Sequence, residues 1–366
     1  MSTILKHELV RGSYFSDDKM FLEPVIESSQ TIPFLESRVL NPEVFSAGIL
    51  QLNRILLAHP GVNLNAFYDP IVTVTENYVD FEGFARFGHS FCKIRFPENL
   101  FKERIRQEGV TSVDFNPRFI RDLNSRFHTQ NLWIYIDPDG VEFAINKTAH
   151  SLKKIKMPNW WKDGYQELEN YVDLETMAPQ FHHKIAEDYN KTILSGKAFQ
   201  QLIQEIDYSY IVKDDRVRSL FWDEKSVNLH LGGRQKEEST SIKLIKSSDK
   251  PSRLWGVWRF RNLVDIADQV IQADVYVANK QPSFWVLHAR SGVQLLLGYT
   301  QFTNAIWTET ARKDIEELLK NPNRGLVEPR PQRRRRRYKM KSKPQSRINF
   351  VQMHPGQLII PDFISN

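Results

Sequence analysis

The sequence contains a single cysteine, Cys92, among 366 residues. One thiol excludes an intrachain disulfide and any zinc site built from several cysteines. Cys92 lies in an apolar run typical of a strand, so we expect a buried side chain rather than a reactive nucleophile. No apolar run approaches the roughly 18 residues that a membrane-spanning helix needs, and no basic segment followed by an apolar one opens the chain. These absences favour a cytoplasmic protein that does not enter a membrane.

Catalytic and cofactor motifs are also missing. His182 and His183 are the only adjacent histidines, and neighbouring residues on a helix diverge by about 100°, which disfavours a shared metal ion. A phosphate loop at residues 195–197 is disfavoured because Ala198 replaces the Ser or Thr that would hold magnesium. We therefore expect no metal and no cofactor.

Charge is distributed very unevenly along the chain. The net charge is +6, yet ten basic residues and no acidic one lie between residues 330 and 347, so the rest of the chain carries a net charge of −4. Arginine-rich segments that lack apolar residues are solvated and often become ordered on DNA or RNA. The sequence does not distinguish the two nucleic acids. The alternative is a solvated charged loop that binds an acidic protein surface or nothing specific. The expected contact residues are Arg330, Arg333, Arg334, Arg335, Arg336, Arg337, Tyr338, Lys339, Lys341, Lys343 and Arg347.

Apolar periodicity predicts helices that alternate with short strands. Asn41 followed by Pro42 is a typical helix opening, and Asn116 with Pro117 repeats it. Apolar runs on both sides of residues 137–140, Asp-Pro-Asp-Gly, indicate a hairpin. These patterns predict an α+β fold in which short antiparallel sheets and meanders pack with amphipathic helices in two halves.

The densest pattern lies between residues 255 and 307, which carry four of the eight tryptophans. Apolar residues at three- and four-residue spacing predict a helix from Phe260 to Ile271, and three strands of a meander follow between residues 274 and 299. A last helix is expected from Thr308 to Lys320. We divide the chain into an amino-terminal region (1–231), a boundary loop (232–250), the tryptophan-rich region (251–320), the basic tract (321–349) and an apolar carboxyl-terminal segment (350–366).

Several short motifs occur in the order found in bacterial SWIM zinc-finger family proteins, and the chain resembles the amino-terminal region of that family. The matching segments are residues 67–74, 79–84, 155–164, 254–259, 282–286 and 296–307. The family's Cys and His zinc ligands are absent here. The resemblance implies an adaptor or recognition component of a bacterial defence system, with a MoxR-type AAA+ ATPase and a von Willebrand factor A domain protein as partners.

Three functions remain open at this level. A non-enzymatic protein that binds nucleic acid through the basic tract is favoured. A metal-dependent nuclease using Asp223, Glu224 and Lys225 is the enzymatic alternative, although no second carboxylate is singled out to hold the ion. A purely structural adaptor that contacts only proteins is the third.

Overall fold

The computed structural model describes most of the first 300 residues, and these belong to one compact unit. The described ranges are 14–16, 19–21, 33–57, 70–85, 90–102, 107–125, 131–146, 148–155, 159–211, 217–222, 226–231, 239–245, 251–255 and 257–300. Within them, no helix is long and apolar enough to cross a lipid bilayer.

The chain repeats one arrangement four times: a strand, a helix and a three-stranded meander. The first repeat comprises β3 (Leu35–Arg38), α2 (Pro42–Leu57), β4 (Ile71–Val74), β5 (Tyr78–Phe84) and β6 (Ser90–Pro97). The second comprises β7 (Gly109–Ser112), α3 (Pro117–Asn124), β8 (Leu132–Asp137), β9 (Gly140–Ile145) and β10 (Thr148–Lys153). The third comprises β13 (Asn190–Ser195), α6 (Gly196–Ile211), β14 (Val217–Trp222), β15 (Ser226–Leu231) and β16 (Ser239–Lys243). The fourth comprises β17 (Ser252–Trp255), the 3₁₀ helix η2 (Val257–Leu263), β18 (Val270–Val277), β19 (Ser283–Ala289) and β20 (Gln294–Tyr299).

A connector joins the second repeat to the third. It contains α4 (Asn159–Leu168), β11 (Val172–Asp173), β12 (Ala178–Pro179) and α5 (His183–Ala186). Three short elements lie outside the repeats: β1 (Tyr14–Ser16), β2 (Lys19–Phe21) and the 3₁₀ helix η1 (Glu98–Leu100).

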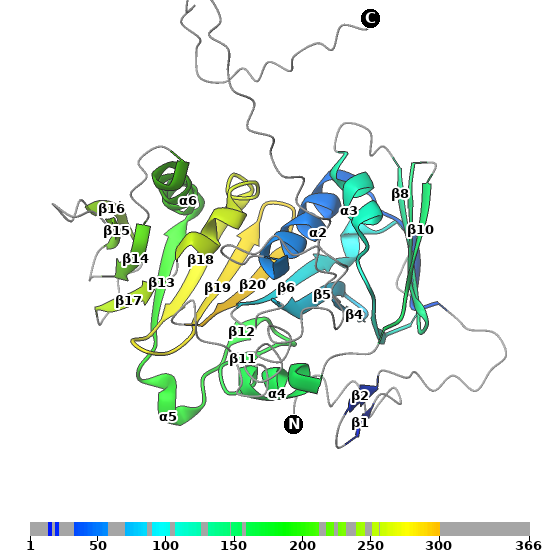
Figure 1. Cartoon of the computed structure of the whole chain (residues 1–366), viewed down its shortest axis with the longest axis horizontal. Coiled ribbons are helices and arrows are strands. Elements are labelled where there is room, and N and C mark those ends of the chain that lie inside the picture. The colour runs from blue at the N-terminus through cyan, green and yellow to red at the C-terminus, as the bar shows by residue number, and fades with distance from the viewer. Residues whose placement is uncertain are drawn as a thin grey trace, which may run out of the picture. The chain divides into compact units, whose positions relative to one another are not determined.

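The strands of the repeats form three large antiparallel sheets. An eight-stranded sheet has the order β13-β18-β19-β20-β6-β5-β4-β7, and two four-stranded sheets have the orders β10-β9-β8-β3 and β16-β15-β14-β17. The two halves of the chain therefore meet inside one sheet, at the antiparallel junction of β20 with β6, where Leu297 lies opposite Cys92. Strands β10 and β16 are the outer strands of the two smaller sheets and lie at opposite ends of this unit (Figure 1).

The eight-stranded sheet is buried on both faces. On one face, α3, α2, η2 and α6 contact one another in a row (Figure 1). Cys92 and Ile94 of β6 point toward this row, within the larger hydrophobic core. The alternating residues, such as Phe84 and Phe91, point to the other face and pack with Trp161 of the connector. A sheet covered on both faces explains the nearly continuous apolar runs in these strands.

Many local predictions are confirmed. The side-chain oxygen of Asn41 accepts a hydrogen bond from the N–H of Val44 at 3.1 Å, and that of Asn116 accepts one from Phe119 at 2.9 Å, so both asparagines cap their helices. The hairpin of β8 and β9 forms at the expected turn. Cys92 is fully buried, and burial raises the pKa of its thiol, as expected of a small core residue.

The helix expected from Phe260 to Ile271 is wrong. Only η2 is helical there, and the chain enters β18 at Val270. Phe260 is buried as expected, but Val264 is 39% exposed and Ile271 is 51% exposed. Strand β18 pairs with both β13 and β19, and this non-local pairing outweighs the local helical spacing. The helix expected from Thr308 to Lys320 lies outside the described residues.

The expected fold class is also wrong. We predicted short antiparallel sheets packed with helices in two halves, whereas three large sheets dominate and the largest one continues through both halves. The reason is physical: the β20–β6 junction joins strands about two hundred residues apart in the chain, and no local pattern reports such pairing.

Candidate functional site

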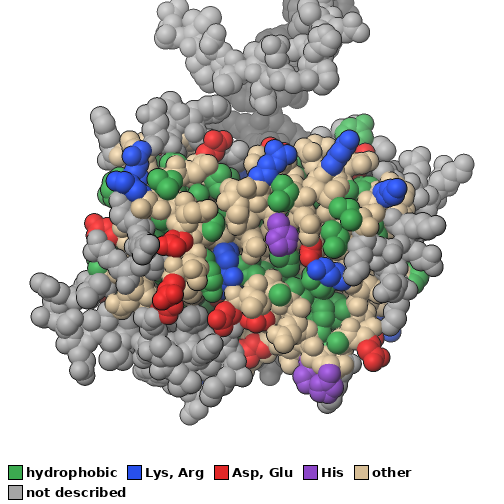
Figure 2. Space-filling model, turned by 180° about the vertical axis from the view of Figure 1, so that it is seen from behind, with side chains coloured by type: hydrophobic (Ala, Val, Ile, Leu, Met, Phe, Trp, Pro, Cys, Tyr) green, Lys and Arg blue, Asp and Glu red, His purple; other side chains and the backbone are tan. Residues whose placement is uncertain are grey.

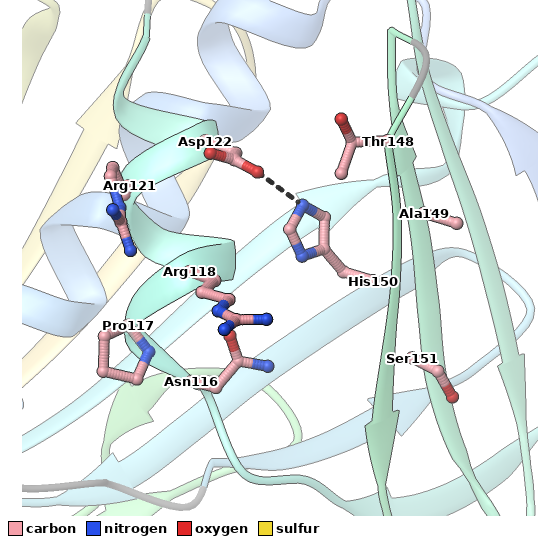
Figure 3. Close-up of a pocket in the computed structure, with 9 residues that line it drawn as sticks. All are labelled: Asn116, Pro117, Arg118, Arg121, Asp122, Thr148, Ala149, His150 and Ser151. Atoms are coloured by element: carbon pink, nitrogen blue, oxygen red, sulfur yellow. Dashed lines mark ion pairs between the residues drawn. The ribbon is translucent and has the colours of Figure 1, made fainter.

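A pocket of about 650 Å³ lies between α3 and the outer strand β10 (Figure 3). Arg118, Arg121 and Asp122 line it from α3, and His150 lines it from β10. The His150 Nε2 atom lies 3.0 Å from the Asp122 Oδ2 atom, which is an ion pair when the imidazole is protonated. This contact directs the carboxylate toward the strand, and the two arginines remain exposed. The pocket therefore combines two exposed arginines with one carboxylate that faces the strand.

Strand β10 also presents backbone groups that no strand of the described chain pairs with. The N–H of Lys154, just after β10, donates to Asp139 on the β9 side, while the N–H of Ile155 donates to Ser112 of β7 on the other side. Because successive N–H groups of a strand alternate in direction, those of Ala149, Ser151 and Lys153 point away from β9. An outer strand with free donors and acceptors is a ready partner for another strand.

Two cations in the row of helices form ion pairs within the chain. Arg54 of α2 pairs with Asp265, which follows η2. The Arg261 Nε atom of η2 lies 2.9 Å from the Asp207 Oδ1 atom of α6. The view from behind also shows cationic and anionic side chains interspersed, and neither sign gathers into one continuous patch (Figure 2). Arg118 and Arg121 of α3 differ from these two arginines, because they are exposed and form no ion pair with another described residue.

A buried charge network occupies the connector face of the sheet. Lys93 on β6 lies 2.9 Å from Asp80 and 2.7 Å from Glu82 on β5, measured from Nζ to the carboxylate oxygens. Arg95 donates two hydrogen bonds to Asp80, at 2.9 and 2.8 Å, and a third to the backbone oxygen of Glu175 in the connector at 2.8 Å. Burial lowers the pKa of Lys93, but the attraction of the two carboxylates outweighs it and the pKa is raised. The network holds the connector on the sheet and suits a structural role.

The described structure does not include the site residues expected from the sequence. The basic tract and residues 223–225 lie outside the described residues. Among those described, no group of three or more His, Cys, Asp and Glu side chains could hold a metal ion. His182 and His183 are exposed, with ring centroids 4.1 Å apart. Sequence reasoning missed the pocket because its two walls come from separate elements; the repeated Asn-Pro helix opening before α3 was the one available signal.

The repeats, the shared sheet and the row of helices define the sliding-clamp fold. The chain is similar to the proliferating cellular nuclear antigen of Entamoeba histolytica, with a TM-score of 0.51, 12% identity, and coverage of 74% of this chain and 99% of that one. It is also similar to the same antigen of A. fulgidus, solved with the C-terminal region of FEN-1 bound, with a TM-score of 0.52, 11% identity, and coverage of 72% and 97%. At this identity the likeness concerns the fold alone. No protein-family model matches the chain, and no curated protein matches it in sequence.

These findings overturn the SWIM zinc-finger resemblance. The matched segments coincide with core strands such as β4, β5 and β20, and any sheet buried on both faces needs similar apolar residues there. The defence-system adaptor and the nuclease drawn from the sequence are corrected with it, since the fold is that of a clamp. The ATPase and von Willebrand factor A partners rested on that resemblance and lose their basis.

Proposed function

We propose that this chain is a subunit of a ring-shaped sliding clamp that encircles duplex DNA and carries partner proteins. The observation that carries the proposal is the internal junction of β20 with β6. These are the third meander strands of the fourth and first repeats, and the corresponding strands of the third and second repeats, β16 and β10, are the outer strands.

Head-to-tail assembly follows from the repeats. The first and second repeats form one half of the chain, and the third and fourth form the other. When each repeat is replaced by its counterpart in the other half, the internal contact between the fourth and first repeats becomes a contact between the second and third repeats. Because the second and third repeats of one chain do not pair in the described structure, this contact would join two copies. Strand β10 of one copy would then pair with β16 of the next, and such a heterologous contact closes into a ring when its rotation allows. The row of helices would line one surface of every subunit, as the wall that faces the enclosed DNA.

Topological retention tests the ring. We expect the protein to remain on a circular plasmid and to leave the same plasmid after it is cut once, because a ring can slide off only from an end. The measurement is the bound fraction over time at about 0.5 M salt, where exposed charge contacts are screened. Equal retention on circular and linear DNA would contradict the encircling proposal.

We further propose that the basic tract supplies most of the electrostatic attraction to DNA. The proposal is supported by the ten basic residues between positions 330 and 347 and by the internal ion pairs of Arg54 and Arg261. Neutralising six to ten phosphates would make the affinity fall by about 10³- to 10⁵-fold between 50 and 200 mM salt.

Deleting residues 330–347 tests this contribution. We expect weaker binding to short linear duplexes at 50 mM salt and a much smaller salt dependence, measured by fluorescence anisotropy. Self-association should not change, which provides the internal control. An unaltered salt slope would show that another surface contacts the phosphates.

A further inference from the structure

The pocket between α3 and β10 faces the outer edge of the second repeat. The Asp122 Oδ2 atom lies 3.0 Å from the His150 Nε2 atom, so the carboxylate faces the strand, while Arg118 and Arg121 are exposed and form no ion pair with another described residue. An anionic side chain that entered the pocket would meet Arg118, which points toward β10, and could reach Arg121 on the other side of α3 (Figure 3).

Helix α6 carries a matching acidic group at the other end of this unit. Asp207 points to η2, where it pairs with Arg261. Because each helical residue advances by about 100°, Glu205 lies about 160° around the helix from Asp207, on the flank turned away from η2. That flank belongs to the third repeat, whose outer strand is β16, and α6 contacts β16 directly. Glu205 is partly exposed and forms no ion pair among the described residues.

The internal junction provides a precedent for such pairing. Beside the β20–β6 contact, Arg54 of α2 pairs with Asp265 after η2, and the Gln51 amide donates to the backbone oxygen of Asn262 at 2.5 Å. The first repeat thus contributes a cation and the fourth an anion. In the contact between copies the second repeat takes the place of the fourth and the third takes the place of the first. Arg118 and Arg121 would then meet Glu205 in an ion pair whose polarity is opposite to that of Arg54 and Asp265.

We propose that the pocket between α3 and β10 receives Glu205 of a second copy of this chain, with Arg118 and Arg121 as its ionic partners. The inference rests on the proposed ring, and it adds an ionic contact that would fix the head-to-tail orientation of successive copies. Two copies that met through β10 alone would bring arginines against arginines, and like charges at an interface cost several kcal/mol. We call this contact of Arg118 and Arg121 with Glu205 the latch. It favours pairing of β10 with β16 of another copy over pairing of β10 with a second β10.

Charge reversal tests the latch. Arg118→Glu combined with Arg121→Glu, or Glu205→Arg alone, should weaken self-association at least about tenfold, because each places like charges across the contact. The triple variant carrying all three substitutions should regain most of the association, since the ion pairs are restored with opposite polarity. Sedimentation equilibrium of the full chain provides the measurement, with circular dichroism to confirm folding.

Lys197→Glu is the matched control, because Lys197 is an exposed cation of α6 that lies near the solvent side rather than on the Glu205 flank. It should leave association unchanged. Association that survives the reversals, or a triple variant weaker than both reversed forms, would overturn the latch but leave the ring. Reversals that reduce only DNA binding would assign the pocket to DNA phosphates and also overturn it. A wild-type chain that stays monomeric at every concentration would contradict the proposed ring itself.

Discussion

Replacing Ser151 by proline should abolish assembly of the ring while leaving the subunit folded. Ser151 lies in the outer strand β10, is exposed, and is inferred to direct its N–H away from β9. Proline removes this donor and places its ring where another strand would approach, yet an edge strand tolerates proline when the lost N–H faced solvent. The bonds between β10 and β9 therefore persist in the isolated subunit.

The expected result is a monomer at concentrations where the wild-type chain associates, as measured by light scattering after gel filtration. Ser151→Thr is the matched control, because threonine keeps the N–H and suits a strand, so it should associate normally. The thermal midpoint of Ser151→Pro should stay close to that of the wild-type subunit under dissociating conditions. A proline variant that assembles as the wild type does would show that β10 is not the contact strand.

Local structure was predictable wherever neighbouring residues decide it. Asn41 and Asn116 cap the helices that the sequence predicts after them. The Ser195 hydroxyl oxygen likewise accepts a hydrogen bond from the N–H of Ala198 at the start of α6. Two of these openings, Asn-Pro in the first and second repeats, are the visible trace of the internal repetition. The Asn-Pro opening is absent from the third repeat, whose helix begins with Ser-Gly, and from the fourth, which contains only a 3₁₀ helix.

Long-range pairing could not be read in the same way. The short apolar runs of β6 and β20 indicate that both are strands, but nothing in either segment specifies that Leu297 lies opposite Cys92. The same limit hid the pocket, whose defining contact joins Asp122 of a helix to His150 of a strand. The basic tract could be found from the sequence because its charges are consecutive. Arg118 and Arg121 could not be recognised as site residues, because their role depends on strand β10, which is distant in the sequence.

Replacing Lys93 by methionine should destabilise the subunit by about 3–5 kcal/mol, the cost of leaving a buried charge without its partner. Asp80 would keep its two hydrogen bonds from Arg95, but Glu82, only 1% exposed, would lose the cation 2.7 Å away. The free energy of unfolding in urea measures the loss.

A second substitution separates lost charge balance from lost packing. Glu82→Gln removes the unpaired charge, so the Lys93→Met/Glu82→Gln double variant should be more stable than Lys93→Met alone. The raised pKa of Lys93 sets the pH dependence: its stabilisation is fully present below the unfolded-state pKa and is lost as pH rises through the higher folded-state value. Wild-type stability should therefore fall at strongly alkaline pH by more than that of the double variant. Equal alkaline profiles, or a double variant less stable than Lys93→Met, would show that the network contributes through packing rather than through its charges.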